Sequence, residues 1–157
     1  MTSRNYLNTF LIAIFILLSC TEKYSANSDY DFNVEDTILN HFPDINHETN
    51  LGNIIGGLSE SECVEGNAIG FTGNLSRTYA YYRKLCQLSS DTLLFSLINN
   101  SNPIVRTYAF KGLKEKNSSL YLKAEKILRS DTTHVCFYMG DTKMELKISD
   151  YVILKNN

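Results

Sequence analysis

The sequence predicts a mainly α-helical fold, in which short antiparallel helical hairpins form an α-solenoid fragment capped by a C-terminal β-hairpin. Between Asn74 and Ser130, apolar residues recur at spacings of three and four, the period of an amphipathic helix. Polar turns divide this region into four short segments, and such helices pack as antiparallel pairs. From about His134 to Ser149, apolar and polar residues alternate instead, as they do in a strand.

The segments before Asn74 carry weaker signals. A short helix is expected from Val34 to Phe42, and Pro43 ends it. The stretch Leu51–Leu58 is weakly helical. Six of the chain's eight glycines lie between Gly52 and Gly73, so most of that range is expected to be a loop.

The first two helices of the main region lie on either side of Ser89–Asp91. The first runs from about Asn74 to Leu88, and its apolar stripe is Leu75, Tyr79, Tyr82 and Cys86. Serine and aspartate side chains accept hydrogen bonds from free N–H groups, so Ser89–Asp91 is expected to cap the second helix. The buried residues expected of that helix are Leu93, Leu94, Leu97 and Ile98.

The next two helices have equally clear boundaries. Asn102 is expected to cap the third, and Pro103 suits its first position, where no backbone N–H is needed. Its apolar stripe is Val105, Ala109 and Leu113. The fourth helix follows Asn117–Ser119, and its expected buried residues are Leu120, Ala124, Ile127 and Leu128.

The alternating C-terminal region predicts two strands joined at Gly140-Asp141, a two-residue turn. The apolar positions of the first strand are Val135, Phe137 and Met139. Those of the second strand are Met144, Leu146 and Ile148. The apolar face of this hairpin is expected to pack on the last helices.

The stretch DTLLFSLINNSNPIVRTYAFKGL, Asp91 to Leu113, resembles one HEAT repeat. The matching features are a leucine-rich first helix, a polar turn, and a second helix that opens on Pro103 and carries Val105, Arg106 and Ala109. The family often has an aspartate in the turn, where this chain has asparagines. The resemblance implies helical hairpins whose surface binds other proteins.

The N-terminal segment FLIAIFILL, Phe10 to Leu18, is too short to span a membrane, which takes about 20 apolar residues. It suits the apolar region of a signal peptide, with the positive Arg4 before it. Leu17–Cys20 (LLSC) follows at once and resembles the lipobox of bacterial lipoproteins. The resemblance implies cleavage before Cys20, acylation of its thiol and anchoring in a membrane of the cell envelope. Thr21 is not an aspartate, which by the same resemblance favours the outer over the inner membrane.

These features divide the chain into three parts. Residues 1–19 are the expected signal peptide, residues 20–33 a polar linker held at the lipid bilayer by acylated Cys20, and residues 34–157 a single helical domain. The net charge is −2. Ten acidic residues against one base occupy residues 21–65, whereas seven acids and thirteen bases occupy residues 66–157. Because those bases are spread along the chain and not clustered, no nucleic-acid partner is expected.

Three cysteines remain after Cys20: Cys63, Cys86 and Cys136. In an oxidising compartment an odd number allows one disulfide and one free thiol, with three possible pairings. Cys86 falls on the expected apolar stripe and is interpreted as buried.

The residue types that can act in catalysis form no recognised catalytic pattern in the sequence. The chain has no Walker A, HExxH or GxSxG motif, and its histidines do not have the spacing of metal ligands, so no catalytic residue, metal or cofactor is expected. Two candidate interaction residues are Arg106 and Tyr81. Arg106 either bonds carbonyls and acids of a neighbouring helix pair or faces a partner. Tyr81 is the one tyrosine of the segment Tyr79–Tyr82 that does not belong to the core stripe.

Two functions remain open. The first is a non-enzymatic module that binds an unidentified envelope protein through its HEAT-like helices. The alternative is an envelope enzyme or small-ligand-binding protein that uses the Gly66–Gly73 loop together with His41 or His134. A concave site in which a histidine meets a carboxylate would favour the alternative.

Overall fold

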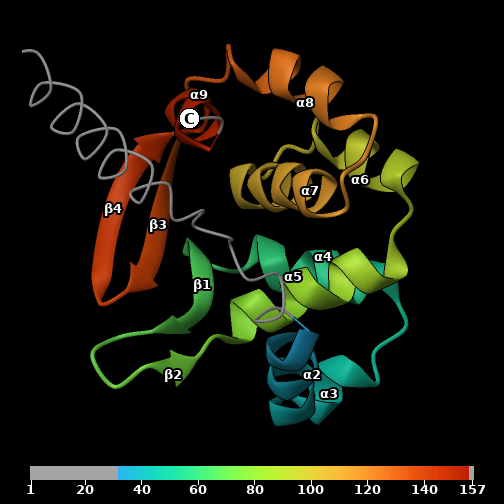
Figure 1. The fold of residues 1–157 in the computed structure, drawn as a ribbon, viewed down its shortest axis with the longest axis vertical. Helices are drawn as coiled ribbons and strands as arrows, with labels where there is room; N and C mark the ends of the chain where they lie inside the picture. The colour runs from blue at the N-terminus through green and yellow to red at the C-terminus, as the bar shows by residue number, and fades with distance from the viewer. Residues whose placement is uncertain (1–31, 156–157) are drawn as a thin grey trace, which may run out of the picture. The chain divides into compact units, whose positions relative to one another are not determined.

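Eight helices and four strands make up the described part of the computed structural model, residues 32–155 (Figure 1). Cys20 and the expected signal peptide lie outside these residues. The helices are α2 (Phe32–His41), α3 (Pro43–Asn46), α4 (Leu51–Ser59), α5 (Arg77–Leu88), α6 (Asp91–Leu97), α7 (Pro103–Glu115), α8 (Tyr121–Leu128) and α9 (Ile148–Leu154). The strands are β1 (Cys63–Ile69), β2 (Asn74–Leu75), β3 (His134–Gly140) and β4 (Thr142–Lys147). The mainly α-helical class is therefore as predicted.

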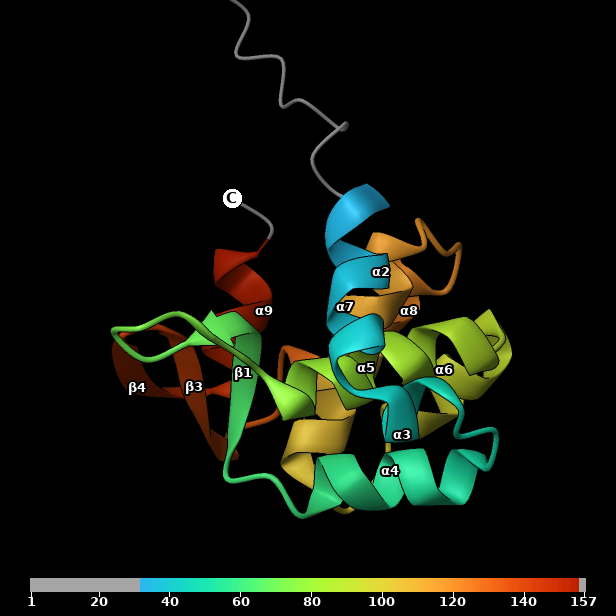
Figure 2. The same ribbon diagram turned by 90° about the horizontal axis from the view of Figure 1, so that it is seen from below.

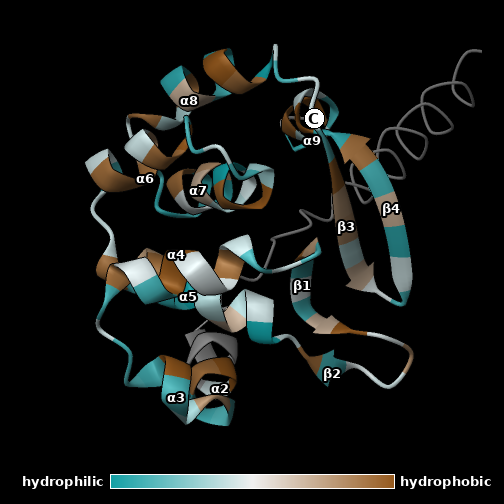
Figure 3. Ribbon diagram, turned by 180° about the vertical axis from the view of Figure 1, so that it is seen from behind, coloured by the Kyte–Doolittle hydropathy of each residue, from teal (hydrophilic) through white to brown (hydrophobic). Residues whose placement is uncertain are grey.

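The strands form one sheet in the order β2-β1-β3-β4, and the helices lie to one side of it (Figures 1 and 2). β1 runs parallel to β3, whereas the two outer pairs are antiparallel. β4 is an edge strand and carries mostly hydrophilic residues (Figure 3), as edge strands often do. α9 lies between the strands β3 and β4 on one side and the helices α7 and α8 on the other.

The loop expected over Gly52–Gly73 is wrong for most of its length. It contains all of α4 but its first residue, the strand β1 and the turn to β2, and α4 coincides with the weak helix expected over Leu51–Leu58. Position 66 of β1 suits a glycine, because a Cβ atom there would lie 3.3 Å from the sulfur of Met139 on β3. Gly70 and Gly73 have φ angles of 75° and 66°, which glycine adopts without strain, and they form the turn.

The β3–β4 pair is antiparallel, with Phe137 opposite Met144, and its turn lies at Gly140 (φ 59°) and Asp141. Two parts of the expectation for this region are wrong. The pair is not terminal, because α9 follows it and β3 also pairs with β1. The second strand ends at Lys147, since Ile148 begins a helix whose residues Ile148, Tyr151 and Val152 are buried at helical spacing.

The helix boundaries follow local caps. Ser90 caps α6, and Oδ1 of Asn102 accepts hydrogen bonds from the N–H groups of Ile104 and Val105 at the start of α7, as predicted. Pro43 begins α3 and α2 has already ended at His41. α5 begins at Arg77, not Asn74, because Leu75 pairs in β2 and Ser76 is the N-cap.

α7 runs through the core. Val105, Tyr108, Ala109 and Leu113 are fully buried, and Leu94 of α6 is fully buried as well, so the predicted stripe of this helix is confirmed. On α5 the stripe is only partly right. Tyr82 is buried with Ala80 and Leu85, but Tyr79 and Cys86 are half-buried. Ile127 of α8 is exposed, because the buried face of that helix is Ala124, Glu125 and Leu128.

A disulfide joins Cys63 of β1 to Cys136 of β3, and Cys86 is the free thiol among the described residues. The two half-cystines are direct partners in the parallel register, with Cα atoms 4.5 Å apart. Burial raises the pKa of the Cys86 thiol to about 11, so this thiol is neutral and of low reactivity at neutral pH.

Candidate functional site

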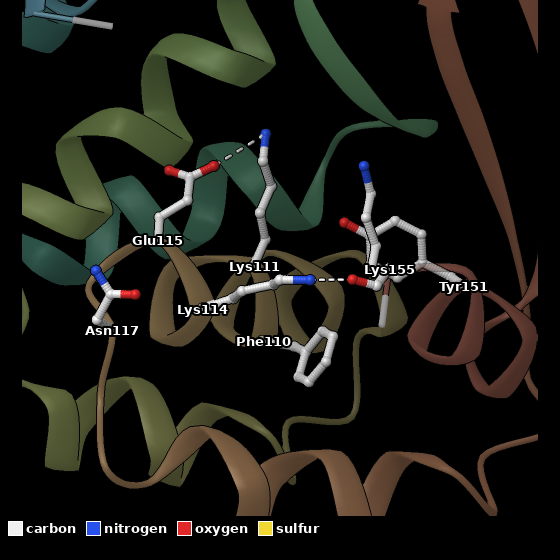
Figure 4. A pocket seen from close by; sticks show the side chains of 7 residues that line it. All are labelled: Phe110, Lys111, Lys114, Glu115, Asn117, Tyr151 and Lys155. Carbon is white, nitrogen blue, oxygen red and sulfur yellow. Dashed lines mark hydrogen bonds and ion pairs between the residues drawn. The ribbon is translucent and has the colours of Figure 1, made fainter. Parts of the chain in front are cut away.

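A cavity of about 440 Å³ lies between α7 and α9 (Figure 4). Its volume is within the range of about 300–1,000 Å³ typical of small-molecule sites. The side chains that line it are Phe110, Lys111, Lys114, Glu115, Asn117, Tyr151 and Lys155. The four from α7 occupy positions i, i+1, i+4 and i+5, which form one continuous face of a helix.

The cavity carries an excess of positive charge. Lys111, Lys114 and Lys155 line it together with a single carboxylate, Glu115. The two oxygens of Glu115 are already shared by two cations: the carboxylate lies 2.8 Å from the guanidinium of Arg83 and 3.7 Å from Nζ of Lys111. Three lysines in the cavity and the neighbouring Arg83 therefore outnumber one acid, an arrangement that attracts anions.

Lys111 lies against two aromatic rings. Its ammonium lies 4.4 Å from the ring centre of Tyr79 and 4.5 Å from that of Tyr82, which is cation–π geometry. The side chain is only 20% exposed. Burial lowers the pKa of Lys111, and the nearby Glu115 opposes this effect. The ammonium is thus poorly hydrated, so an anion can bind to it at a lower desolvation cost than to a surface lysine.

Lys114 connects the two helices that form the cavity. Its Nζ donates a hydrogen bond to the backbone carbonyl of Lys155, at the end of α9. The ammonium of Lys155 lies 5.9 Å from the ring centre of Tyr151. In Figure 4 the ammonium groups of Lys111 and Lys155 point to the same side of the cavity.

Stacked aromatic rings form the apolar wall. Phe110 stacks on Tyr121 with ring centres 5.0 Å apart, and Tyr151 stacks on Phe137 at 4.7 Å. Phe110 and Tyr151 meet edge to face at 6.4 Å. Burial raises the pKa of Tyr151 well above its ordinary value, so its ring remains neutral. Stacking of this kind fixes the position of the aromatic wall.

Arg106 lies at the edge of the α7 stripe, away from this cavity. Its guanidinium donates to the carbonyl oxygens of Asn100 (2.8 Å) and Ser101 (3.0 Å), to Oδ2 of Asp131 (3.0 Å) and to Oγ1 of Thr133 (3.1 Å). Burial alone would raise the pKa of Asp131, but hydrogen bonds from Thr133 and the charge of Arg106 outweigh it and lower that pKa. These contacts are those of a structural arginine.

Tyr81 packs between helices. A side chain at Gly57 of α4 would come within 2.5 Å of its ring, and the guanidinium of Arg77 lies 5.6 Å from its ring centre. The ring therefore fills the space above Gly57 and is only half-exposed.

The structure does not bring the Gly66–Gly73 loop to His134. Ile69, at the end of β1, pairs with Gly140, whereas His134 begins β3 at the other end of the same strand pair. Six residues of strand separate these ends, or about 20 Å. His41 ends α2 and contacts the ring of Phe42 edge to face. Within residues 32–155, no group of three potential metal ligands was found.

The cavity lysines are not among the site residues that the sequence predicts. Lys111 and Lys155 are 44 positions apart, and Tyr151 lies in a helix that was not expected. The one signal was the pattern FKGLK, Phe110 to Lys114, which puts an aromatic ring and two lysines on neighbouring turns of a predicted helix.

No family model matches this chain, and no curated protein matches it in sequence. Among the described helices, none combines the length and the apolar character needed to cross a membrane.

Proposed function

We propose that this chain is a lipid-anchored protein of the bacterial cell envelope, whose helical domain is a non-enzymatic module that binds another envelope protein. In this proposal, acylated Cys20 holds the protein at the outer membrane in preference to the inner membrane, and residues 20–33 connect the anchor to the domain. The support is the lipobox-like LLSC after a short apolar segment. Labelling with a fatty-acid analogue tests it: the label should be lost in Cys20→Ala, and a label that survives would overturn it.

The proposed module is built on the HEAT-like pair α6 and α7, with the β3–β4 hairpin as its cap. Two features support this assignment. Both helices begin after the cap residues expected from the sequence, Ser90 and Asn102. Arg106 bonds the turn between the two helices and also Asp131 beyond the next helix, so it joins consecutive helix pairs.

The observation that carries the binding role is the outer face of α8, defined as Leu122, Lys123, Lys126 and Ile127. These four positions, i, i+1, i+4 and i+5, form one continuous surface. All four are exposed, with Leu122 71% and Ile127 41% accessible. α8 lies at the edge of the helical layer (Figure 1). In a helical solenoid the next repeat would pack against such a face, and here a partner protein takes that place. Two apolar and two cationic side chains suit a partner with an apolar groove bordered by acids.

Co-purification from crosslinked envelopes tests this role. Leu122→Asp should remove the partner, because the substitution puts a charge in the apolar centre of the contact. Phe71→Asp is the matched control, since Phe71 is 96% exposed in the turn between β1 and β2 and lies outside the α8 face. Equal partner recovery with Leu122→Asp and the native chain would reject the α8 face.

A second candidate function, binding of a small ligand, is favoured by the cavity between α7 and α9. This ligand site differs from the one expected from the sequence, because neither the Gly66–Gly73 loop nor a histidine lines the cavity. The lysines around the aromatic wall would supply the polar contacts.

A further inference from the structure

A second hollow, of about 250 Å³, adjoins the cavity of Figure 4. Tyr151 and Lys155 line both, and these residues are one helical turn apart on the same side of α9. The two hollows are therefore neighbours that α9 borders along one face. They differ in charge, because three lysines and Glu115 line the first, whereas Lys155 is the one charged residue that lines the second.

At the cationic end, two of the three lysines form no ion pair with a carboxylate of residues 32–155. Glu115 pairs with both Arg83 and Lys111, so one negative charge is shared, while Lys114 and Lys155 have no carboxylate within ion-pair distance among the described residues. The hydrogen bond from Lys114 to the carbonyl of Lys155 uses one of its three donors. A carboxylate placed here would receive charge-assisted hydrogen bonds from at least two lysines.

The apolar end is lined by side chains of β3, β4 and α9. They are Phe137, Met139, Met144, Leu146 and Leu154, beside Tyr151. Met144 is 43% exposed and Leu154 is 62% exposed, so apolar surface here remains in contact with water. Methionine side chains adapt their shape to a flexible apolar ligand, and two of the lining residues are methionines.

We propose that the paired hollows bind a single-chain amphiphile with an anionic head, of the class of long-chain carboxylates. The carboxylate lies among Lys111, Lys114 and Lys155, and the hydrocarbon chain passes Tyr151 and lies along Met139, Met144 and Leu154. This inference names the ligand class for the second candidate function and rests on it. A membrane surface is a poorer occupant, because the Lys111 side chain is only 20% exposed and its ammonium lies against the rings of Tyr79 and Tyr82 and not at the surface.

The chain contains three methionines, which provide a direct readout. Met139 and Met144 line the apolar hollow, whereas Met1 lies far from it in sequence, outside the described residues. The full chain carrying Cys20→Ala is labelled with ¹³C-methyl methionine, so that no acyl group on residue 20 competes. Laurate, kept below its micelle concentration, should shift the Met139 and Met144 signals with 1:1 saturation and leave the Met1 signal unchanged. Methyl laurate should bind at least about tenfold more weakly, because it lacks the charge that the lysines recognise.

Lysine variants test the head group. Lys111→Gln and Lys155→Gln should each weaken laurate binding about tenfold, because each loses a charge-assisted hydrogen bond. Lys155 is exposed at the end of α9, so Lys155→Gln should fold normally even if Lys111→Gln does not. Lys147→Gln is the matched control, an exposed lysine before α9 that lines neither hollow and should leave the affinity unchanged.

The outcomes that overturn the inference are distinct. Equal affinities for laurate and methyl laurate would show that the charge is not recognised. The same methionine shifts with lipid vesicles alone would identify a membrane-contact surface instead. Butyrate that binds as tightly as laurate, with the same dependence on Lys111 and Lys155, would reject the amphiphile but keep ligand binding at the cavity. Failure of both laurate and butyrate to bind in calorimetry, which does not depend on the methionines, would reject the second candidate function itself.

Discussion

The guanidinium of Arg106 lies 2.9 Å from the carboxylate of Asp131, although 25 positions separate the two residues. Both side chains are largely buried, and the same guanidinium donates to the carbonyls of Asn100 and Ser101. One side chain on α7 thereby holds the turn before that helix and the segment that follows α8. This relationship explains why an arginine stands beside an otherwise apolar stripe.

Arg106→Ala should lower the free energy of unfolding by about 2–3 kcal/mol, because it leaves two carbonyls and a carboxylate without their charged donor. Urea unfolding monitored by circular dichroism measures the change. Arg77→Ala is the control, since its pair with Asp44 is about half-exposed and should matter little. If the two variants are equally stable, the structural role of Arg106 is wrong. Unchanged stability with loss of the partner would place Arg106 in the interface.

The stability supplied by Asp131 should depend on pH. Its pKa is lowered in the folded state, so its contribution is fully present above the ordinary pKa of aspartate, near 4, and is lost as the pH falls through the folded-state value. The difference in unfolding free energy between the native chain and Asp131→Asn should therefore be largest near neutral pH and shrink below about pH 4. Asp141→Asn, in the exposed β3–β4 turn, should show a small difference at every pH. A constant difference for Asp131→Asn would contradict the ion pair.

Two neighbouring glycines of α4 should respond oppositely to alanine. Gly56→Ala meets no atom within 4 Å and should stabilise the protein by up to about 1 kcal/mol through helix propensity. Gly57→Ala meets the ring of Tyr81 at 2.5 Å and should be less stable than Gly56→Ala by about 1–3 kcal/mol. Thermal unfolding of both variants measures the difference. Equal melting temperatures would mean that the Tyr81 ring is free to move, as a ligand-binding tyrosine would be.

The disulfide Cys63–Cys136 should contribute about 4 kcal/mol to stability, because it closes a loop of 73 residues in the unfolded chain. The double variant Cys63→Ala, Cys136→Ala should show this loss in urea unfolding. A reductant should destabilise the native chain by a similar amount and have no effect on the double variant. Destabilisation of the double variant by reductant would mean that another disulfide is present.

The elements that could be predicted from the sequence are those with local signals. α6 and α7 begin where Ser90 and Asn102 can cap them, and Pro103 fixes the first turn of α7. The core stripe of α7 follows from apolar residues at i, i+4 and i+8, because a buried helix needs one continuous apolar face.

The elements that could not be predicted depend on distant partners. β1 contains Gly66 and alternates weakly, and its pairing partner β3 lies about 70 positions further along the chain. The sequence predicts a strand as far as about Ser149, where α9 begins, because Ile148 continues the alternation of β4. The cavity needs α7 and α9 side by side, so no pattern within either segment could reveal it. Arg106 and Tyr81 were identified as candidate interaction residues by sequence, but the pairing of Arg106 with Asp131 needed the fold.

The most direct test of the proposed function is site-specific photocrosslinking in intact cells. A photoreactive residue at position 122 on the outer face of α8 should form one defined crosslink, and the same residue at position 71 should form none. Crosslinking from position 122 should also disappear in Cys20→Ala, because release from the membrane separates the module from an envelope partner. No crosslink from position 122, or the same crosslink from positions 122 and 71, would contradict the account of a lipid-anchored binding module.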